Sequence, residues 1–324
     1  MPVRLMHVLG HPRLPMDTES FPEDAQVWTC RRFCDLLSYL KIPFLYYGVR
    51  GSKVPEGGEL VPCRKLRNSW HFRNQAHYDY NGRLSALLEK HVGKGDGELI
   101  ASLYGAPQAD IADKGLKVIE PMVGYDHCWT HYRVFPSYAQ QNVIYATWSS
   151  LTWEDRCNDA VIPHFANPEE FHLSPHPGEY LLYLGRDGLG KGNDIAREVA
   201  RLAGLPLREE HSGWSGQAKA NLIADARAVL VPTRYVEPFG YVVIEALLSG
   251  TPVITSDWGS FPELVINGFN GFRCRRIDDY LRAVQDVTTL DRKAIRADAV
   301  ARFSLEAVAP KYLSYFEAVL NNRQ

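Results

Sequence analysis

The 324-residue sequence lacks several features that would each indicate a particular class of protein. No apolar run approaches the ~18 residues of a membrane span, and the amino-terminal residues lack the long apolar core of a signal peptide. The net charge of −2 gives no general basic field for nucleic acid. The six cysteines fit no zinc-ligand spacing, so we expect reduced core thiols in a cytoplasmic protein.

The sequence does contain short strand patterns that alternate with helical ones. Strand patterns at 3–10, 42–47, 98–104, 117–120 and 160–163 are interspersed with helical patterns at 23–40, 72–92 and 134–149. A proline-rich stretch, 164–178, follows. The alternation then restarts, with strands at 180–184, 228–231 and 252–255 and helices at 194–203, 218–227, 240–249, 277–289, 291–303 and 305–320.

This order predicts an α/β protein with two Rossmann-like, doubly wound parallel-sheet domains that face each other across a cleft. We place the first domain at residues 1–165 and the second at 166–303. Residues 304–324 form a last helix, which we expect to pack back toward the first domain. Ligands of such sheets bind at the carboxyl ends of the strands, so the loops that follow the strands are the places to search.

One glycine-rich loop lies between a strand and a helix, in "YLLYLGRDGLGKGNDIA". It nearly matches the ATP-binding P-loop, but Gly192 stands where that motif has the hydroxyl that holds Mg²⁺. It nearly matches the dinucleotide motif too, with Asn193 in place of the third glycine. A simple turn is a third interpretation. A fourth is a metal-free diphosphate site, in which Arg186 and Lys191 neutralise a leaving group.

A second stretch, "EPFGYVVIEALLSGTPVIT", places two carboxylates around the start of a helix. Glu237 precedes this start and Glu245 lies roughly 7 Å along the helix. A phosphate at the amides near Gly240, a sugar at Glu237 and a ribose at Glu245 would use all three features, because carboxylates accept hydrogen bonds from vicinal hydroxyls. The alternative is a charge at the helix start plus a surface residue.

As a set, these motifs resemble the nucleotide-sugar domain of the retaining GT-B glycosyltransferases of family 4 (group 1). The matching segments run over about residues 180–275 and are listed here: Gly185-Arg186, Lys191-Gly192, Pro232-Thr233, Glu237–Gly240 with Glu245, Gly250–Ile254, and Gly259 with Pro262-Glu263. The segment "VIPHFANPEEF" also resembles the family's segment between the domains, with His164 in place of the usual asparagine.

The resemblance implies a hexosyltransferase that uses a nucleotide-diphosphate sugar, with UDP favoured, and that needs neither a metal nor a cofactor. It implies that Arg186 and Lys191 bind the diphosphate, that Glu237 contacts the donor sugar and that Glu245 binds the ribose. The remaining donor-binding candidates are Gly185, Thr233, Pro238, Phe239, Gly240 and Tyr241. Compared with the family, the second domain looks abridged by a strand or more between residues 204 and 222. Trp214, in that segment, could stack on the base or simply cap the core.

The first domain matches the family in architecture alone. Its segment 118–138 weakly resembles phage and bacterial members, so Asp126 and His127 are candidates near the donor sugar, with a structural aromatic cluster as the alternative. Gly10, His11 and Arg13, after the first strand, are candidates for the acceptor site. Residues 50–74 interleave cations with aromatics, which predicts either a solvated surface or a DNA-binding one, with hydroxymethylated phage-type DNA as acceptor in a host cytoplasm.

Two other functions compete with an active transferase. A P-loop NTP hydrolase is one, although no acidic strand end for Mg²⁺ is evident. A glycan- or DNA-binding module that keeps a donor-like site without turnover is the other.

Overall fold

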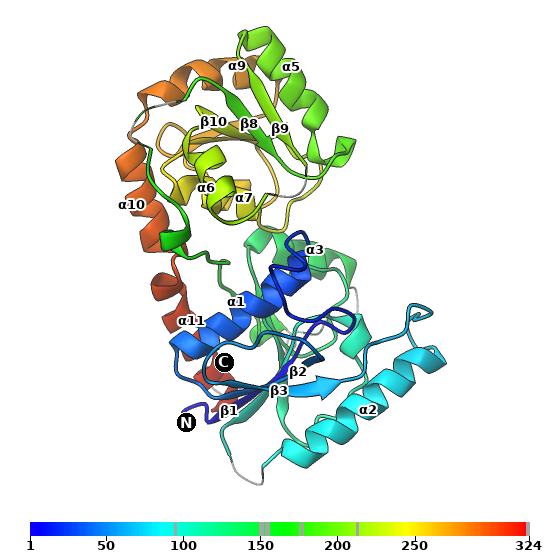
Figure 1. The fold of residues 1–324 in the computed structure, drawn as a ribbon. Helices are drawn as coiled ribbons and strands as arrows, with labels where there is room; N and C mark the ends of the chain where they lie inside the picture. The colour runs from blue at the N-terminus through cyan, green and yellow to red at the C-terminus, as the bar shows by residue number, and fades with distance from the viewer. Residues whose placement is uncertain are drawn as a thin grey trace. The chain divides into compact units, whose positions relative to one another are not determined.

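The computed structural model describes residues 1–93, 96–148, 152, 156–174, 176, 178–211 and 214–321. The chain forms two compact units (Figure 1). Unit 1 comprises Met1–Pro136, Ile144–Ile162 and Ala309–Gln324, and unit 2 comprises Ser137–Val143 and Pro163–Val308. The chain therefore changes unit four times, after Pro136, within α3 (Tyr138–Thr147), after Ile162 and within α11 (Leu305–Leu320).

Unit 1 is built on a sheet of seven parallel strands in the order β3-β2-β1-β4-β5-β6-β7. The strands are β1 (Leu5–Leu9), β2 (Phe44–Val49), β3 (Gly58–Cys63), β4 (Glu98–Ser102), β5 (Lys117–Glu120), β6 (Tyr132–Phe135) and β7 (Ala160–Val161). The strand order reverses between β1 and β4, so the loops that follow these two strands lead away in opposite directions. Such a switch point is where α/β sheets bind their ligands.

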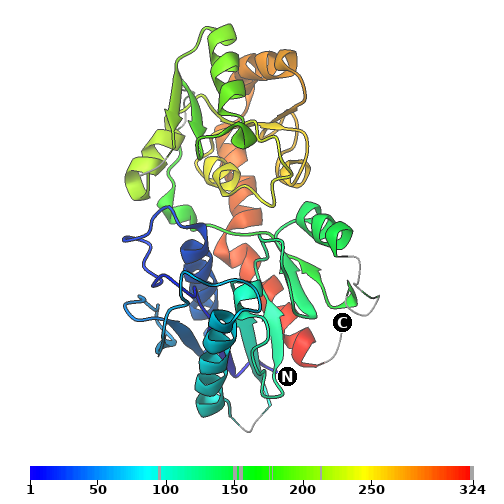
Figure 2. The ribbon, with the colours of Figure 1, turned by 90° about the vertical axis from the view of Figure 1, so that its right-hand side faces the viewer.

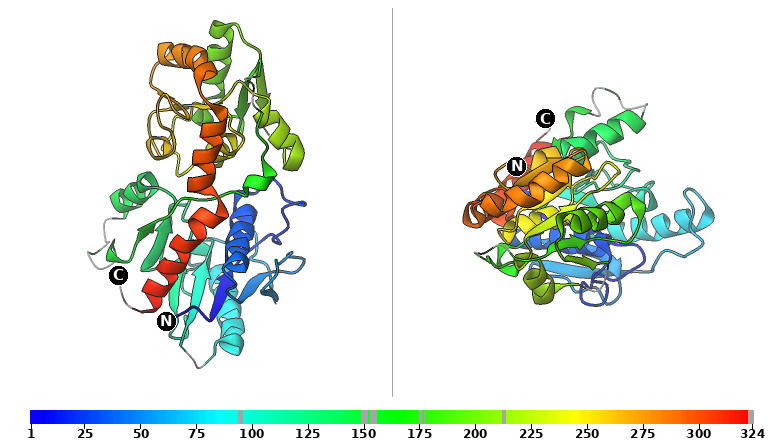
Figure 3. Two further views of the ribbon diagram at one scale, coloured as in Figure 1. Left: turned by 90° about the vertical axis from the view of Figure 1, so that its left-hand side faces the viewer. Right: turned by 90° about the horizontal axis from the view of Figure 1, so that it is seen from above.

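Helices bury the two faces of this sheet. Helix α2 (Gln75–His91) lies along the strands, as Figure 2 shows, and packs through Tyr80, Leu84 and Leu88. Helix α1 (Ala25–Tyr39) starts at the side chain of Asp24, which accepts from two amides of the first turn. Helices α1 and α11 lie side by side (Figure 3), and the rings of Phe33 and Phe316 meet edge to face at 6.2 Å.

Unit 2 has five parallel strands in the order β12-β11-β10-β8-β9, with its switch point between β8 and β10. These are β8 (Leu181–Leu184), β9 (Leu207–Glu210), β10 (Ala228–Val231), β11 (Val253–Ser256) and β12 (Gly271–Cys274). Helices α5 (Asn193–Ala203) and α9 (Ile277–Asp286) lie together on one face (Figures 1 and 3). The other face carries α6 (Gly216–Ala224), α7 (Tyr241–Leu248) and α10 (Arg292–Phe303), and the short α8 (Phe261–Leu264) packs at its edge.

The structure confirms the α/β fold and corrects several elements. Four strands went unpredicted, namely β3, β6, β9 and β12, and residues 134–135, placed in a helix from the sequence, end β6 instead. The segment that looks abridged against the family contains one strand, β9, which the sequence analysis did not identify, and the abridgement itself stays a prediction. All six cysteines are free, but Cys157 is exposed and Cys63 half-buried, so the expectation of core thiols holds for four of them. Among the described residues, no helix has the length and apolar character to cross a bilayer.

Candidate functional site

The glycine-rich loop of unit 2 connects β8 to α5 at the switch point of the sheet. Residues Leu189–Lys191 make a short 3₁₀ turn, and Gly192 then adopts a left-handed conformation (φ +74°) before α5 begins. A Cβ atom on Gly192 would lie 2.1 Å from the carbonyl oxygen of Pro232, which follows β10. Only glycine fits at this contact. The same packing explains why the loop lacks the hydroxyl residue that a P-loop needs after its lysine.

The ammonium group of Lys191 meets a carboxylate 46 residues further along the chain. Its Nζ atom donates to Glu237 Oε2 at 2.7 Å and lies 4.9 Å from the centroid of the Tyr235 ring. Tyr235 Oη donates to the same Oε2 atom at 3.0 Å. Burial acts to lower the pKa of Lys191, but Glu237 outweighs it and the net shift is upward, so the lysine is charged. The two side chains predicted to bind phosphate and sugar are thus brought together.

Two glycines hold the backbone of Glu237 in place. Gly259 has φ +64°, and a Cβ atom there would lie 2.6 Å from the Glu237 amide nitrogen. The carbonyl oxygen of Glu237 accepts from Ser260 N at 3.1 Å. Gly240 has φ +89° and begins α7 without any side-chain cap, and a Cβ atom on it would lie 3.1 Å from the Phe261 ring. A close backbone contact at Gly259 and a left-handed backbone at Gly240 therefore favour glycine on both sides of this loop.

Glu245, the second predicted carboxylate, is buried within α7 and is 4% exposed. Its oxygens accept from Lys219 Nζ of α6 at 2.7 and 2.8 Å. The alternative of a simple surface residue is wrong for Glu245.

Thr233 follows β10 and is fully buried, and its hydroxyl oxygen has no hydrogen-bond partner in the described part of the chain. A buried hydroxyl without a partner is costly, which suits a group that awaits a ligand.

The next candidate cation, Arg186, is exposed directly after Gly185, at the end of β8. Within the described residues its guanidinium has no ion-pair partner, while its carbonyl oxygen accepts from Tyr183 Oη at 3.0 Å. Arg186 and Lys191 therefore belong to one loop but differ in state: Lys191 is held by Glu237 and Arg186 is not.

One group of side chains near this loop could hold a cation. Ligand atoms of Asp187, Glu209 and His211 lie within 4.8 Å of one another. However, Glu209 already accepts two bonds from Arg197, both at 2.6 Å, and lies 3.0 Å from His211 Nε2. Arg197 also lowers the pKa of Glu209. A metal would have to compete with the arginine for the same carboxylate, so the residues do not favour one.

Three further donor candidates lie around the start of α7. His164 stacks on Tyr241, with ring centroids 4.8 Å apart and planes 11° apart, and meets the buried Phe239 edge to face at 4.9 Å. The carbonyl oxygen of Pro238 accepts from Ser137 Oγ at 2.6 Å. Where the family has asparagine, His164 thus supports the helix start by ring packing.

Glu263 has a role that the sequence did not reveal, whereas Trp214 packs against the core, as one of its two interpretations predicted. Glu263, part of the motif set, accepts from the amides of Tyr138 and Ala139 at 2.9 Å each, so it caps the start of α3 within unit 2. Trp214 packs partly against the core and donates to Glu210 Oε2 at 2.7 Å. Base stacking by Trp214 stays a prediction.

In unit 1, the candidates Gly10 and His11 are tightly packed at the end of β1. A Cβ atom on Gly10 would lie 2.1 Å from the Tyr46 ring. The Nδ1 atom of His11 accepts from the amides of Arg13 and Leu14 at 3.1 and 2.9 Å, and burial lowers the pKa of His11 to about 4. His11 is therefore neutral and shapes this loop.

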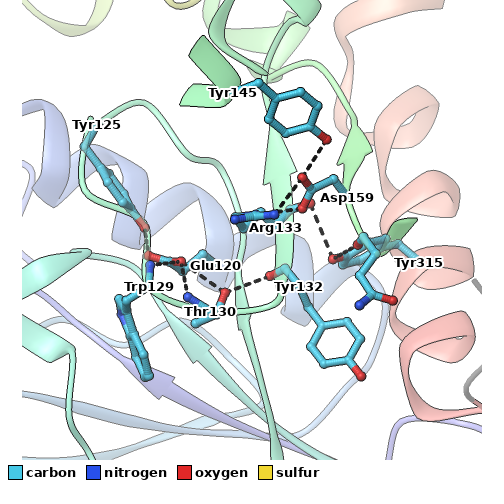
Figure 4. A network of polar contacts seen from close by, with 10 residues as sticks. Glu120, Tyr125, Trp129, Thr130, Tyr132, Arg133, Tyr145, Asp159 and Tyr315 are labelled. Carbon is cyan, nitrogen blue, oxygen red and sulfur yellow. Dashed lines mark hydrogen bonds and ion pairs between the residues drawn. The ribbon is translucent and has the colours of Figure 1, made fainter. Parts of the chain in front are cut away.

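Asp126 and His127 are exposed on a loop that folds around a different residue, Glu120. Figure 4 shows this buried carboxylate at the end of β5 with the donors that surround it. Glu120 accepts from the amides of Trp129 and Thr130 at 2.9 Å each, from the hydroxyl of that threonine at 3.0 Å and from Tyr125 at 3.1 Å. Burial raises the pKa of Glu120, against the opposing effect of these donors.

A second network, on the adjacent strands, completes this part of unit 1 (Figure 4). The buried Arg133 binds Asp159 through two nitrogens, at 2.7 and 3.0 Å, and Tyr145 Oη donates to Asp159 at 2.7 Å. Tyr315 of α11 donates to the carbonyl oxygen of Asn158 at 3.0 Å. The side chain of His127 is exposed, and its role near a donor sugar stays a prediction.

The sequence of unit 2 matches a known family. Residues 172–299 match the family model "Glycosyl transferases group 1". Over 83 residues the chain is 40% identical to glycogen synthase of Mycobacterium tuberculosis, a match that covers 25% of this chain and 20% of that protein. Over 162 residues it is 32% identical to D-inositol 3-phosphate glycosyltransferase of Rhodococcus erythropolis, covering 46% and 36%. The chain thus spans well under two thirds of these relatives.

Solved structures share the fold over nearly the whole chain. AviGT4, a glycosyltransferase involved in avilamycin A biosynthesis, has a TM-score of 0.71 at 19% identity, with 98% of each chain covered. Anabaena HepE, solved in complex with UDP and glucose, has a TM-score of 0.67 at 14% identity, covering 98% of this chain and 100% of that one. Residues 172–299 are therefore similar to glycosyl transferases group 1, within a chain that has the GT-B fold of solved glycosyltransferases.

Proposed function

We propose that the protein is a retaining glycosyltransferase of family 4 type, which moves a hexose from a nucleotide-diphosphate sugar to a hydroxyl acceptor. The observation that carries the proposal is the contact of Lys191 with Glu237 at 2.7 Å. It joins a group suited to phosphate with one suited to sugar hydroxyls, at the switch point where ligands of such sheets bind. The glycosyltransferase relatives and the UDP complex of HepE support the same donor class.

In the proposed mechanism the protein stabilises charge and positions the substrates. Arg186 and Lys191 neutralise the diphosphate as the bond to the sugar breaks, with the uncapped start of α7 adding its amides. Glu245 accepts from the ribose hydroxyls and Glu237 from the sugar. The leaving diphosphate takes the acceptor proton on the same face, so the reaction needs neither a metal nor a strongly basic side chain.

The P-loop alternative gains nothing from the structure. Gly192 is locked against the Pro232 carbonyl oxygen, and no side chain can be added there to bind Mg²⁺. DNA remains one hypothesis for the acceptor, because Arg64, Lys65 and Arg67 of the segment 50–74 are exposed. Lys53 of the same segment already forms ion pairs with Asp17 and Glu19, at 2.9 and 2.6 Å.

A thermal-shift panel of nucleotides and nucleotide sugars tests the proposal directly. A ligand at ~100 times its dissociation constant should stabilise the protein by ~2.7 kcal/mol. We expect UDP and a UDP-hexose to stabilise it, and ATP to have little effect. Slow hydrolysis of the UDP-hexose without acceptor would then separate an enzyme from a binding module. Stabilisation by ATP with Mg²⁺ alone would contradict the proposal.

A further inference from the structure

Unit 1 contains a guanidinium that has no partner. Arg13 lies in the loop after β1, at the switch point of the sheet, and is half-buried. Its Nε atom is buried without a hydrogen-bond partner, and within the described residues no carboxylate lies within ion-pair distance of the side chain. The carboxylate of Asp24 forms no ion pair with Arg13; its Oδ1 atom accepts from the amides of Gln26 and Val27 at 2.9 Å each and lies 3.8 Å from His11 Nε2. Within the described residues, Arg13 therefore has no ion-pair partner.

A second orphan donor lies against this arginine. The Cζ atom of Arg13 is 6.0 Å from the centroid of the Trp70 ring, and Trp70 Nε1 is likewise buried with no acceptor in the described part of the chain. Arg273 and Arg292 also have a buried Nε atom without a partner, but their guanidinium groups bind Asp257 and backbone carbonyl oxygens through other nitrogens. Arg83 and Arg227 share the orphan Nε atom, and Arg13 differs from them in its contact with a ring whose own N–H lacks an acceptor among the described residues. Two neighbouring donors that both lack an acceptor point to a ligand that supplies one.

The surrounding charge indicates that this ligand is an anion. The chain after β3 runs beside the Arg13 loop, because Leu66 N donates to the Pro12 carbonyl oxygen at 2.8 Å and Leu66 itself is buried. Its neighbours Arg64, Lys65 and Arg67 are exposed, and none of them has an ion-pair partner among the described residues. This loop, between β3 and α2, follows the carboxyl end of β3 in Figure 1.

We propose that Arg13 and Trp70 form an oxyanion subsite through which unit 1 binds a phosphate group of its acceptor. The planar fork of an arginine matches the oxygens of a phosphate, and the indole N–H supplies a further donor. A phosphate is favoured over a carboxylate because three more cations lie on the adjacent segment. A doubly charged group is attracted to these cations more strongly than a singly charged one. The inference rests on the proposed function, since it names the chemical class of the acceptor for that reaction.

Calorimetry of the full-length protein with glycerol 3-phosphate as probe tests this subsite. Arg13→Gln should weaken binding at least about tenfold, and Trp70→Phe, which keeps the ring but removes the N–H, should weaken it by a smaller factor. The matched control is Arg32→Gln, whose guanidinium lies 5.2 Å from the ring of Trp28, an indole that already donates to Pro22. It should bind the probe like the wild type.

Further variants distinguish a loss of phosphate binding at this subsite from misfolding and from changes at the donor site. Arg13→Lys keeps the charge and loses the fork, so a partial loss is expected in a protein with an unchanged melting temperature. Lys191→Ala should lose affinity for UDP and keep that for glycerol 3-phosphate. Failure of UDP to bind the wild type would count against the proposed function alone.

Two outcomes would contradict the proposed subsite, and a third would identify the source of the phosphate that it binds. The inference is wrong if Arg13→Gln binds glycerol 3-phosphate as well as the wild type does. It is also wrong if the wild type binds no phosphate probe with a dissociation constant below about 10 mM. A single-stranded oligonucleotide that binds more tightly than the small phosphate, with a steep salt dependence that Arg13→Gln reduces, would show that the phosphate comes from a nucleic acid.

Discussion

The contact between Lys191 and Glu237 leads to an unusual expectation for nucleotide affinity. If Lys191 binds the diphosphate, the ligand must first draw its ammonium group away from Glu237 Oε2, at 2.7 Å. Replacing Glu237 by glutamine removes this competitor. UDP should therefore bind more tightly to Glu237→Gln than to the wild type, even though the sugar contact is lost.

The magnitude follows from the burial of the pair. The Lys191 and Glu237 side chains are 25% and 11% exposed, so the pair lies between a surface ion pair and a fully buried one. Exposed pairs contribute ~0.2–1 kcal/mol, and breaking a buried one costs ~3–5 kcal/mol. An intermediate ~1–2 kcal/mol corresponds to UDP binding that is tighter by about 5- to 30-fold. Transfer should fall by about 10- to 100-fold, because a charge-assisted bond to the sugar is worth ~1.5–3 kcal/mol.

Calorimetry with UDP, paired with turnover of a UDP-hexose, measures both effects. Lys191→Met should lose both UDP affinity and turnover. Glu198→Gln is the control, since Glu198 pairs with Arg201 on the exposed side of α5. If Glu237→Gln weakens UDP binding, Lys191 does not exchange the carboxylate for the diphosphate, and the assignment of the two side chains is wrong.

Four further outcomes are expected. Glu245→Gln should weaken UDP and the UDP-hexose equally, by about tenfold or more in calorimetry, because both ligands share the ribose; unequal losses would place the ribose elsewhere. EDTA should leave turnover unchanged, and a strict need for Mn²⁺ would instead direct attention to Asp187 and its neighbours. Burial lowers the pKa of His11 from 6.5 to about 4, so the unfolded chain binds a proton more readily than the folded one as the pH falls through this range. In denaturant titrations, the free energy of unfolding of the wild type should therefore fall by up to ~3 kcal/mol between pH 6.5 and 4, relative to that of His11→Asn. Above pH 6.5 the two proteins should show no such pH-dependent difference. Glu120→Gln should lower the free energy of unfolding by ~1–3 kcal/mol, since an amide cannot accept from all four donors, and an unchanged denaturation midpoint would rule out this role.

The sequence predicts best where one pattern dominates a segment. The bounds of β10 and α11 match their predictions residue for residue, because a continuous apolar run and a sustained helical stripe leave no alternative. Three of the four unpredicted strands, β3, β9 and β12, lie at the edges of their sheets, and β3 and β9 are mostly exposed or half-buried, so their apolar patterning is weak. Their existence depends on the neighbouring strand and not on their own composition.

The site is predictable in part for the same reason. Lys191, Glu237 and Glu245 stand out by motif, but their contacts come from tertiary packing: Glu237 is 46 residues from Lys191, and Lys219 has no local signal that links it to Glu245. The sequence analysis did not identify Glu120, because an acidic residue at the end of a strand is expected to be exposed to solvent. Its burial depends on the loop that follows it, which wraps four donors around the carboxylate.

The passage of α11 into unit 1 constrains the order in which the protein can be completed during synthesis. Unit 1 starts at the first residue, yet it takes its last helix from Ala309 onward, after all of unit 2 has been made. Until then Phe33 lacks the ring of Phe316, and the carbonyl oxygen of Asn158 lacks the hydroxyl of Tyr315. A nascent unit 1 therefore waits on the ribosome with apolar surface uncovered, while unit 2 closes first from a nearly continuous stretch of chain. Removal of residues from Ala309 onward would thus destabilise unit 1, although most of that unit precedes unit 2 in the sequence.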